Sequence, residues 1–259
     1  MDMTAQRELA RLLAALRREQ RSQSGLAPHL VPPDKATAYK IAGMVAEDLG
    51  WPVLGWKIAA MKEEMQQALR TDSPIYGRVY FVAETPHTAV HARLASPIPE
   101  VEYQAKLGRD LPPRDKPYTL EEVTDAVASL HAGLELAECR FIHDALFPPL
   151  PAILADGAGS GTIIHGPAIE DWRNRDIAGQ EATLSSDGCL RRKGTAGAAL
   201  DHPVVPLTWL ANELSRTGVG MKEGQMVSTG TLTGMLAPKP GETYVADFGP
   251  FGSVEVSIS

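Results

Sequence analysis

Apolar and polar residues alternate with a helical period in the first part of the chain. Between about residues 4 and 21, leucines recur three or four positions apart, with charged residues on the other face, and this spacing predicts an amphipathic helix. A segment rich in Ser, Gly and Pro follows at residues 22–33, after which Asp34 is placed to cap a second helix that ends at Gly50. Residues 53–59 predict a strand, and residues 61–69 predict a short helix.

From about residue 75 the pattern changes to short apolar or alternating runs, punctuated by Gly, Pro and Asp. Such runs predict strands and turns; they lie at residues 77–83, 100–107, 133–141, 161–165, 182–185, 226–229, 243–248 and 253–258. A capping box predicts a helix that starts at Thr119, another helix is predicted over 203–217, and residues 186–188 predict a hairpin turn. We therefore expect an α+β protein with a helical N-terminal region, residues 1–75, and a mixed β region, residues 76–259, in one compact unit.

Composition and charge exclude several classes of protein. Of the 259 residues, 44% are hydrophobic and 22% are charged, which is typical of a globular protein. The net charge of −7 argues against nucleic acid or a membrane surface as partner, and we expect the basic cluster Arg17, Arg18 and Arg21 to be a solvated helix face. No apolar run is long enough to span a membrane, and the N-terminus lacks the apolar stretch of a signal peptide. Cys139 and Cys189 lack metal-type spacing, and two free thiols indicate a cytoplasmic location.

Three glutamates support the main chemical hypothesis. Glu100 and Glu102 lie two positions apart on a predicted strand and so share one face, and Glu135 lies in a mostly apolar segment. Two carboxylates side by side on one strand face repel each other and raise each other's pKa, unless water screens them or a cation lies between them. The pattern alone leaves open a solvated strand face or a metal site. Three carboxylate ligands that leave further coordination positions of the ion open suit Mg2+ or Mn2+ better than Zn2+.

Two further segments contain candidate site residues, each with an ordinary structural alternative. Lys57 lies inside an apolar strand, where a buried lysine needs a partner or loses its proton. Alternatively, Lys57 ends a strand and its ammonium reaches the solvent. Asp156 and Ser160 belong to the glycine-rich segment 156–161, which is either a surface loop or the lining of a pocket.

The segment 228–234 is the third candidate. It contains Thr229, Gly230 and Thr231, whose hydroxyls and backbone N–H groups could bind a carboxylate. Equally, it could be a strand followed by a turn. None of these segments is specific alone.

Together, in this order and spacing, the segments resemble the fumarylacetoacetate hydrolase superfamily. Within it, they are similar to the branch of 2-keto-4-pentenoate hydratases and 2-oxo-3-hexenedioate (4-oxalocrotonate) decarboxylases. The resemblance covers most of the chain, from the N-terminal helices to residues 247–255. The matching segments are 55–58, 73–77, 100–102, 108–112, 134–135 with Arg140 just after, 155–156, 202–203 and 229–234.

The resemblance implies a fold, a metal site and a quaternary structure. The C-terminal part would be the family's mixed β-sandwich roll, with the helical N-terminal part packed on it. Glu100, Glu102 and Glu135 match the family's metal-ligand positions, usually occupied by Mg2+, and Lys57 matches its active-site lysine. Family members are generally homo-oligomers, and hydratases and decarboxylases of this branch associate with each other.

The implied activity is that of a hydro-lyase in aromatic or related catabolism. It would add water to a small 2-hydroxy-2,4-dienoate, or its 2-oxo tautomer, and give a 4-hydroxy-2-oxo acid. The expected catalytic residues are Lys57 and Asp156, and the expected substrate-binding residues are Lys57, Ser160, Thr229, Gly230 and Thr231. Two alternatives use the same metal: decarboxylation of a 2-oxo-3-enedioate, or C–C hydrolysis of an acylpyruvate, which needs a base such as His131 or His143. A third alternative is a non-catalytic accessory subunit.

The chain departs from the family pattern near the expected site. The family commonly continues Gly-x-Lys-Ile with a glycine and a Thr-Ser pair, where this chain has Ala59, Met61 and Lys62. The usual Ala-Asp-Asn-Ala-Ser is Ala-Asp-Gly-Ala-Gly at residues 155–159, and Asp201 replaces the glycine before His-Pro. These changes leave the glutamates intact, so they bear on the substrate more than on the reaction, and they leave open a weakly active or inactive member.

Overall fold

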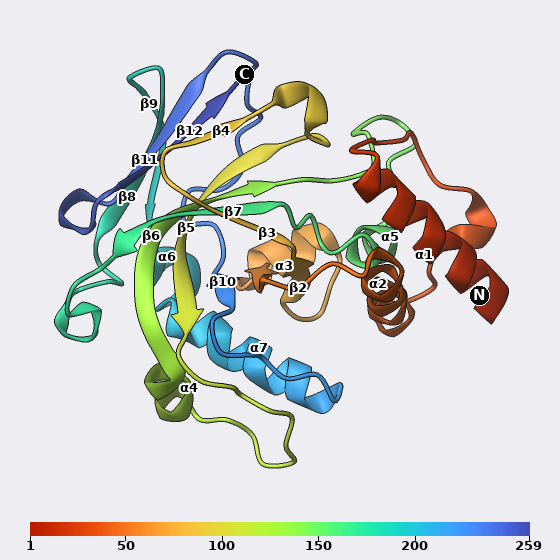
Figure 1. The fold of residues 1–259 in the computed structure, drawn as a ribbon, viewed down its shortest axis with the longest axis horizontal. Helices are drawn as coiled ribbons and strands as arrows, with labels where there is room; N and C mark the ends of the chain where they lie inside the picture. The colour runs from red at the N-terminus through yellow and green to blue at the C-terminus, as the bar shows by residue number, and fades with distance from the viewer.

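The computed structural model describes residues 1–259, whose strands form two sheets (Figure 1). The strands are β1 (Gly55–Ala59), β2 (Ile75–Val79), β3 (Phe81–Glu84), β4 (His87–Ala89), β5 (Ile98–Leu107), β6 (Val127–Ala137), β7 (Thr162–Ala168), β8 (Glu181–Ser186), β9 (Cys189–Thr195), β10 (Met226–Ser228), β11 (Thr243–Asp247) and β12 (Ser253–Ile258). The helices are α1 (Met3–Arg18), α2 (Lys35–Leu49), α3 (Glu63–Leu69), α4 (Leu120–Ala126), α5 (Leu150–Ala155), α6 (Ala196–Leu200) and α7 (Val204–Arg216).

The larger sheet curls back on itself. Its seven strands lie in the order β2-β1-β10-β5-β6-β7-β3, and the outermost strands β2 and β3 are separated in the chain by Tyr80 alone. The pairs β1–β10 and β3–β7 are parallel, and the other pairs are antiparallel. The curl turns one face of the sheet inward, so side chains at alternate positions of every strand meet inside it.

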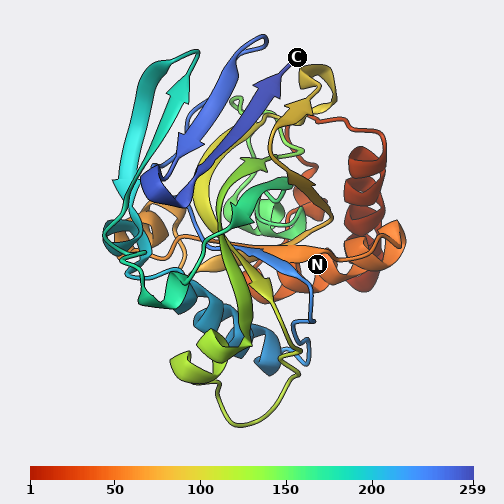
Figure 2. The same cartoon turned by 60° about the vertical axis from the view of Figure 1, so that its left-hand side comes forward.

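The outer face of the curled sheet packs against the second sheet. This five-stranded sheet has the order β4-β12-β11-β8-β9, and its blue and cyan strands form a separate layer in Figure 2. The larger hydrophobic core lies between the sheets and α7, and includes Tyr103, Leu134, Tyr244 and Phe248. Because successive strand residues point to opposite faces, this packing leaves the neighbours of Tyr103 and Leu134 on the inner face.

The helices α1, α2 and α5 form a smaller core at one side of the curled sheet (Figure 1). Leucines of α1 that recur at helical spacing are buried there, among them Leu9 and Leu13, against Ile41 of α2 and Leu154 of α5. No helix combines the length and the apolar character needed to cross a membrane. The chain is thus a mixed helix-and-strand protein with curled sheets.

Most of the predicted elements are present. The α2 helix follows the Asp34 cap and ends at Gly50, which has a left-handed φ of 63°, and the Thr119 capping box begins α4. The run predicted as one strand over 77–83 is two strands that meet at Tyr80. Sequence patterns did not predict the short elements β4, α5 and α6. The expected boundary after residue 75 stays a prediction; β1, from the helical region, lies inside the large sheet.

Candidate active site

The three glutamates come together inside the curled sheet. Glu100 on β5 lies directly opposite Glu135 on β6, and Glu102 follows on the same face of β5. One carboxylate oxygen from each residue lies within 4.8 Å of the other two. Their exposed fractions are 8% for Glu100, 1% for Glu102 and 0% for Glu135, so the alternative of a solvated strand face is wrong.

Lys57 on β1 faces the same interior. Its Nζ atom lies 3.9 Å from Oε2 of Glu135, and the residue is 4% exposed, so the strand-end alternative is wrong. Burial opposes the charged form of Lys57, but the attraction of Glu135, Glu100 and Glu102 outweighs burial and raises the pKa of the lysine. When all four groups are ionised, three carboxylates and one ammonium carry a net charge of minus two. One divalent cation would neutralise that charge.

Burial raises the pKa of each glutamate, and repulsion between the carboxylates adds to the effect for Glu102 and Glu135. For Glu135, burial raises the pKa to about 7, although the nearby Lys57 ammonium lowers it. For Glu102, burial raises the pKa well above its ordinary value, and repulsion from Glu135 and Glu100 adds to the effect. The protein alone therefore does not balance these charges, which is typical of a site built for a further group.

The donor set fits a hard divalent cation. Oε2 of Glu135 is buried and has no hydrogen-bond partner within the protein, while Oε1 accepts a hydrogen bond from the Gly161 N–H at 3.4 Å. All three candidate ligands are carboxylates, the oxygen donors that Mg2+ and Mn2+ prefer. A cation between the three carboxylates would give the unpartnered oxygen its missing contact.

Glu102 is bound by the segment 228–234, which the sequence predicts to bind a carboxylate; we call this segment the Glu102 cradle. Its Oε2 atom accepts hydrogen bonds from Oγ of Ser228 at 2.5 Å and from the N–H of Gly230 at 2.7 Å. Gly230 has a φ of 115°, a conformation that side-chain-bearing residues rarely adopt. The cradle thus binds a carboxylate of the chain itself.

The two threonines of this segment have different environments. The Thr229 hydroxyl is fully buried and donates to the carbonyl oxygen of Tyr103 at 3.0 Å. The Thr231 hydroxyl is half-buried and donates to the carbonyl oxygen of Gly234 over a longer distance, 3.3 Å. Of these two predicted substrate-binding hydroxyls, the one of Thr231 is the more available.

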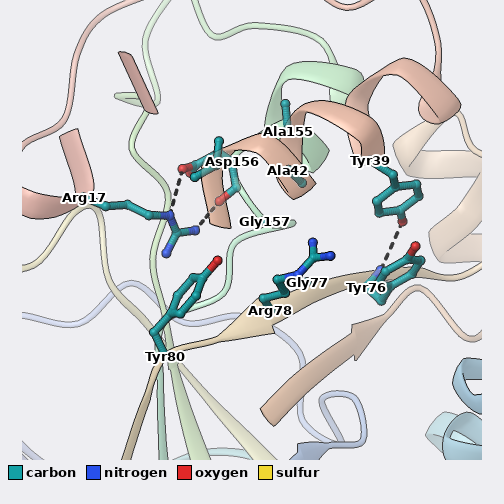
Figure 3. A pocket seen from close by; sticks show the side chains of 11 residues that line it. Arg17, Tyr39, Ala42, Tyr76, Gly77, Arg78, Tyr80, Ala155, Asp156 and Gly157 are labelled. Atoms are coloured by element: carbon teal, nitrogen blue, oxygen red, sulfur yellow. Dashed lines mark hydrogen bonds and ion pairs between the residues drawn. The ribbon is translucent and has the colours of Figure 1, made fainter. Parts of the chain in front are cut away.

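Asp156 lies in an ion-pair cluster on the helical side (Figure 3). Its carboxylate contacts Nε of Arg140 at 3.0 Å and Nε of Arg17 at 3.6 Å. Arg17 is 9% exposed, so the prediction that Arg17 belongs to a solvated helix face is wrong, whereas Arg21 is exposed. Burial and repulsion from Arg140 lower the pKa of Arg17 to about 10. No polar contact joins Asp156 to Lys57, so the structure lends no support to an orienting role of Asp156 toward the lysine.

The segment 156–161 runs between this cluster and the glutamates. Oγ of Ser160 lies 3.3 Å from Nη2 of Arg17 and is 1% exposed, so that hydroxyl already has a partner. The next residue, Gly161, donates its N–H to Glu135. The segment therefore lines the site through its backbone, and Arg17 of α1 and Arg140 help to fix its position.

Two of the residues that depart from the family pattern pair with each other. Nζ of Lys62 donates to Oδ1 of Asp201 at 2.9 Å; Lys62 is half-buried and Asp201 is exposed. Leu200, next to Asp201, lies 3.6 Å from the position that a Cβ of Gly230 would occupy. The pair therefore connects the segment after β1 to the loop beside the Glu102 cradle.

The two histidines that flank Glu135 in sequence are not available as a base. Nδ1 of His131 lies 2.8 Å from the carbonyl oxygen of Gly166, and Nε2 lies 2.8 Å from Oγ of Ser129. His143 is exposed and stacks on Phe147. The base that an acylpyruvate hydrolase would need is therefore not supplied by either residue.

A small crevice and a larger surface hollow both lie away from the glutamates. The crevice shown in Figure 3 has a volume of about 10 Å³, room for a single water, and is lined by Arg17, Tyr80 and Asp156 among others. A hollow of about 540 Å³ lies between α1, β3 and β4. None of the three glutamates lines either of them.

Sequence reasoning did not predict Gln104 and Arg17 as site residues, and it included Ser228 only as the first residue of the 228–234 segment. For Gln104 a signal existed, because it continues the alternation of Glu100 and Glu102 along β5. For Ser228 the signal was weak, since pairing of β10 with β5 cannot be derived from local patterns. For Arg17 a signal also existed, because it lies four residues after Leu13 and eight after Leu9, on the apolar face of the helix.

Comparison with known proteins identifies the relatives of the chain. No sequence profile of a known protein family matches it. It is 32% identical over 216 residues to the 2-keto-4-pentenoate hydratase of Paraburkholderia xenovorans, covering 81% of this chain and 77% of that protein. It is 28% identical over 265 residues to the 2-keto-4-pentenoate hydratase of Burkholderia vietnamiensis, covering 99% of this chain and 100% of that protein.

Solved structures show the same fold. The 4-oxalocrotonate decarboxylase of Pseudomonas putida, solved with magnesium and adipate, superposes with a TM-score of 0.89 at 20% identity, covering 100% of this chain and 99% of that one. The fumarylacetoacetate hydrolase of Exiguobacterium antarcticum superposes with a TM-score of 0.57 at 15% identity, covering 80% and 75%. The chain therefore belongs to the 2-keto-4-pentenoate hydratase family, and it shares its fold with the 4-oxalocrotonate decarboxylase and the fumarylacetoacetate hydrolase.

Proposed function

We propose that this protein is a metal-dependent hydro-lyase that adds water to a small 2-hydroxy-2,4-dienoate and releases a 4-hydroxy-2-oxo acid. The observation that supports this most is the buried group of Glu100, Glu102 and Glu135 with Lys57 beside it. The relatives named hydratases, which match nearly the whole chain, support the reaction type. The helical part on a β-sandwich roll, as in the superfamily, is part of the same proposal.

Glu100, Glu102 and Glu135 would hold Mg2+ or Mn2+. When bound, a divalent cation supplies Lewis-acid chemistry: it attracts the substrate carboxylate and the 2-oxygen and stabilises negative charge there. In this arrangement the three carboxylates would orient the cation, and the curled sheet would keep bulk water from it. The relative solved with magnesium has the same fold.

Lys57 would hold a proton next to the 2-oxygen of the substrate. Its charged form is favoured by the three carboxylates, so its Nζ can stabilise negative charge on that oxygen or return a proton to it. The dienol gains a proton at C5 as the 2-oxo group forms. Water then adds at C4, and C3 takes the second proton, so one molecule of water is consumed.

The predicted substrate-binding residues differ in whether their hydrogen-bonding groups already have partners and in how deeply they are buried. The N–H groups of Gly230 and Gly161 already donate to Glu102 and Glu135, and the Thr231 hydroxyl donates to the carbonyl oxygen of Gly234. Thr231 is only half-buried, so we propose its hydroxyl as the most accessible of the predicted substrate contacts. Ser160 and Thr229 would have to exchange existing bonds in order to bind a substrate. We propose Asp156 as a positioning residue, which fixes the 156–161 segment through its two arginines.

The test is incubation of the pure protein with Mg2+ and a panel of 2-hydroxy-2,4-dienoates. Loss of the diene absorbance, with the acid product and CO2 measured in the same sample, separates hydration from the alternatives. Formation of a 4-hydroxy-2-oxo acid without CO2 supports the proposal. Release of CO2 in equal amount indicates a decarboxylase, and no turnover with any dienoate, in a protein that Mg2+ and oxalate do not stabilise, indicates an accessory subunit.

A further inference from the structure

Gln104 extends the polar row of β5 beyond the glutamates. It lies two residues after Glu102 on the inner face and is 0% exposed. Its Nε2 donates to Oγ of Ser228 at 3.0 Å, whereas its Oε1 is buried without a hydrogen-bond partner. A buried amide with an unpartnered acceptor is uncommon and costs free energy. Packing alone does not account for a glutamine at this position.

The bonds form a chain with a defined direction, from Gln104 through Ser228 to Glu102. The Gln104 amide nitrogen can only donate, so Oγ of Ser228 must accept from it. The single Ser228 proton is then free to point at Oε2 of Glu102, 2.5 Å away. If the amide were turned round, its oxygen would take the Ser228 proton, and an ionised Glu102 would face Oγ of Ser228 at that short distance without a hydrogen between the two oxygens.

The hydrogen bonds to Glu102 all reach the same oxygen. Oε2 receives the Ser228 proton and the Gly230 N–H, which leaves Oε1 as the oxygen without a donor. A carboxylate whose partners fix its orientation is a better metal ligand, because less freedom is lost when the ion binds.

Gly133 makes room for the glutamine. It lies on β6 opposite Glu102, and a Cβ at this position would lie 2.2 Å from Cγ of Gln104. Any residue other than glycine would displace the Gln104 side chain. The glycine and the glutamine therefore form one structural unit behind the metal-ligand positions.

We propose that Gln104, through Ser228, is a positioning residue that orients Glu102 for a divalent cation, and that Gly133 is required for it. This inference rests on the proposed function, because it assumes that the glutamates bind a cation. Gln104 itself touches neither the other two glutamates nor Lys57 through any hydrogen bond or ion pair.

The first test compares Gln104→Met with Gln225→Met. Gln225 lies just before β10 and makes three side-chain hydrogen bonds, with Trp56, Lys222 and Val53, which makes it a matched control. Mn2+ binding to each protein is measured from the free-ion signal in electron paramagnetic resonance, and thermal unfolding is measured without metal. We expect Gln104→Met to weaken Mn2+ binding about tenfold or more, as loss of an outer hydrogen-bond partner commonly does. Gln225→Met should lower the melting temperature and leave Mn2+ affinity unchanged.

The second test is a double-mutant cycle of Gln104→Ala and Gly133→Ala, again measured by Mn2+ affinity. If Gly133 acts only by admitting the glutamine, each single variant weakens binding and the double variant is no weaker than Gln104→Ala alone. Losses that multiply contradict the role assigned to Gly133.

The outcomes separate this inference from the proposed function. Wild-type affinity for Mn2+ in Gln104→Met, in a protein that turns over substrate, refutes the positioning role while the hydratase proposal stands. A wild-type protein that binds no Mn2+ refutes both. A variant that binds Mn2+ weakly, but also melts far below Gln225→Met without metal, assigns Gln104 to stability and contradicts the proposal.

Discussion

Replacement of Lys57 by methionine should affect metal binding and catalysis in opposite directions. Methionine keeps the length of the side chain and removes its charge. The ammonium lies among the same carboxylates that would bind the cation, so it competes with the cation for them and repels it. Without the ammonium, the three glutamates should bind Mn2+ more tightly. The proton and the positive charge next to the substrate 2-oxygen are lost, so turnover should fall.

The distances give the size of both effects. At the 3.9 Å between Nζ of Lys57 and Oε2 of Glu135, a pair of unit charges interacts by about 1 kcal/mol in water and about 4 kcal/mol at an effective dielectric constant of 20. A cation held by the same oxygens experiences the ammonium on this scale. Since 1.4 kcal/mol is a tenfold change, Mn2+ affinity should rise roughly fivefold or more. Loss of a positioned proton donor should reduce kcat by roughly 10²–10⁴.

The assay measures Mn2+ binding and dienoate turnover in the same preparations. It is performed at about pH 8.5, because removal of Lys57 raises the pKa of Glu135, already about 7, and protons would then compete with the ion. Lys57→Arg keeps the charge, and Lys106→Met removes an exposed lysine from β5 as a control. Lys106→Met should change neither quantity.

Two results would refute the reasoning. If Lys57→Met loses Mn2+ binding together with activity, Lys57 is needed to assemble the glutamates and has no separate role in the chemistry. If kcat is unchanged and only KM rises, Lys57 anchors the substrate carboxylate and transfers no proton.

Three further predictions follow from buried groups. Glu135→Gln should abolish Mn2+ binding and turnover while raising the metal-free melting temperature, because it removes one of three repelling buried carboxylates; a lower melting temperature would count against the charge imbalance. Arg17→Met should reduce the free energy of unfolding by about 2–4 kcal/mol in urea denaturation, because breaking a buried ion pair costs about this much, whereas the exposed Arg18→Met should change it by less than about 0.5 kcal/mol. With a thiol reagent at about pH 8, only the exposed Cys189 should react, since Cys139 is buried and burial raises its pKa to about 11. In denaturant Cys139 should react as well. Reaction of two thiols in the native protein would contradict this.

The local pattern was enough to predict most of the strands and the metal-ligand candidates, but not β4 or the division of residues 77–83 between two strands. Residues two apart on a strand share a face, so Glu100 and Glu102 could be paired from the sequence alone. Glu135 was a candidate because it lies in an apolar segment, but its position opposite Glu100 could not be derived, since it depends on a pairing between segments about 35 residues apart. The assembled triad is therefore a tertiary feature that the sequence indicates but does not specify.

Burial of charged residues was the least predictable property. The helical period places Arg17 on the face of Leu9 and Leu13, but it does not reveal the partner of Arg17, which is the acid of a loop more than 130 residues away. The same holds for Asp156, whose partners on α1 and after β6 make it part of an ion-pair cluster. Contacts between distant segments determine the partners of Arg17 and Asp156, and local periodicity does not reveal those contacts.

The metal site itself can be tested by one crystallographic measurement. Crystals of the protein soaked in Mn2+ would be measured near the manganese absorption edge, and the anomalous difference map would locate the ion. The account predicts one strong peak about 2.0–2.2 Å from a carboxylate oxygen of each of Glu100, Glu102 and Glu135. A map without a peak between these residues, in crystals where Mn2+ is bound elsewhere or not at all, would contradict it.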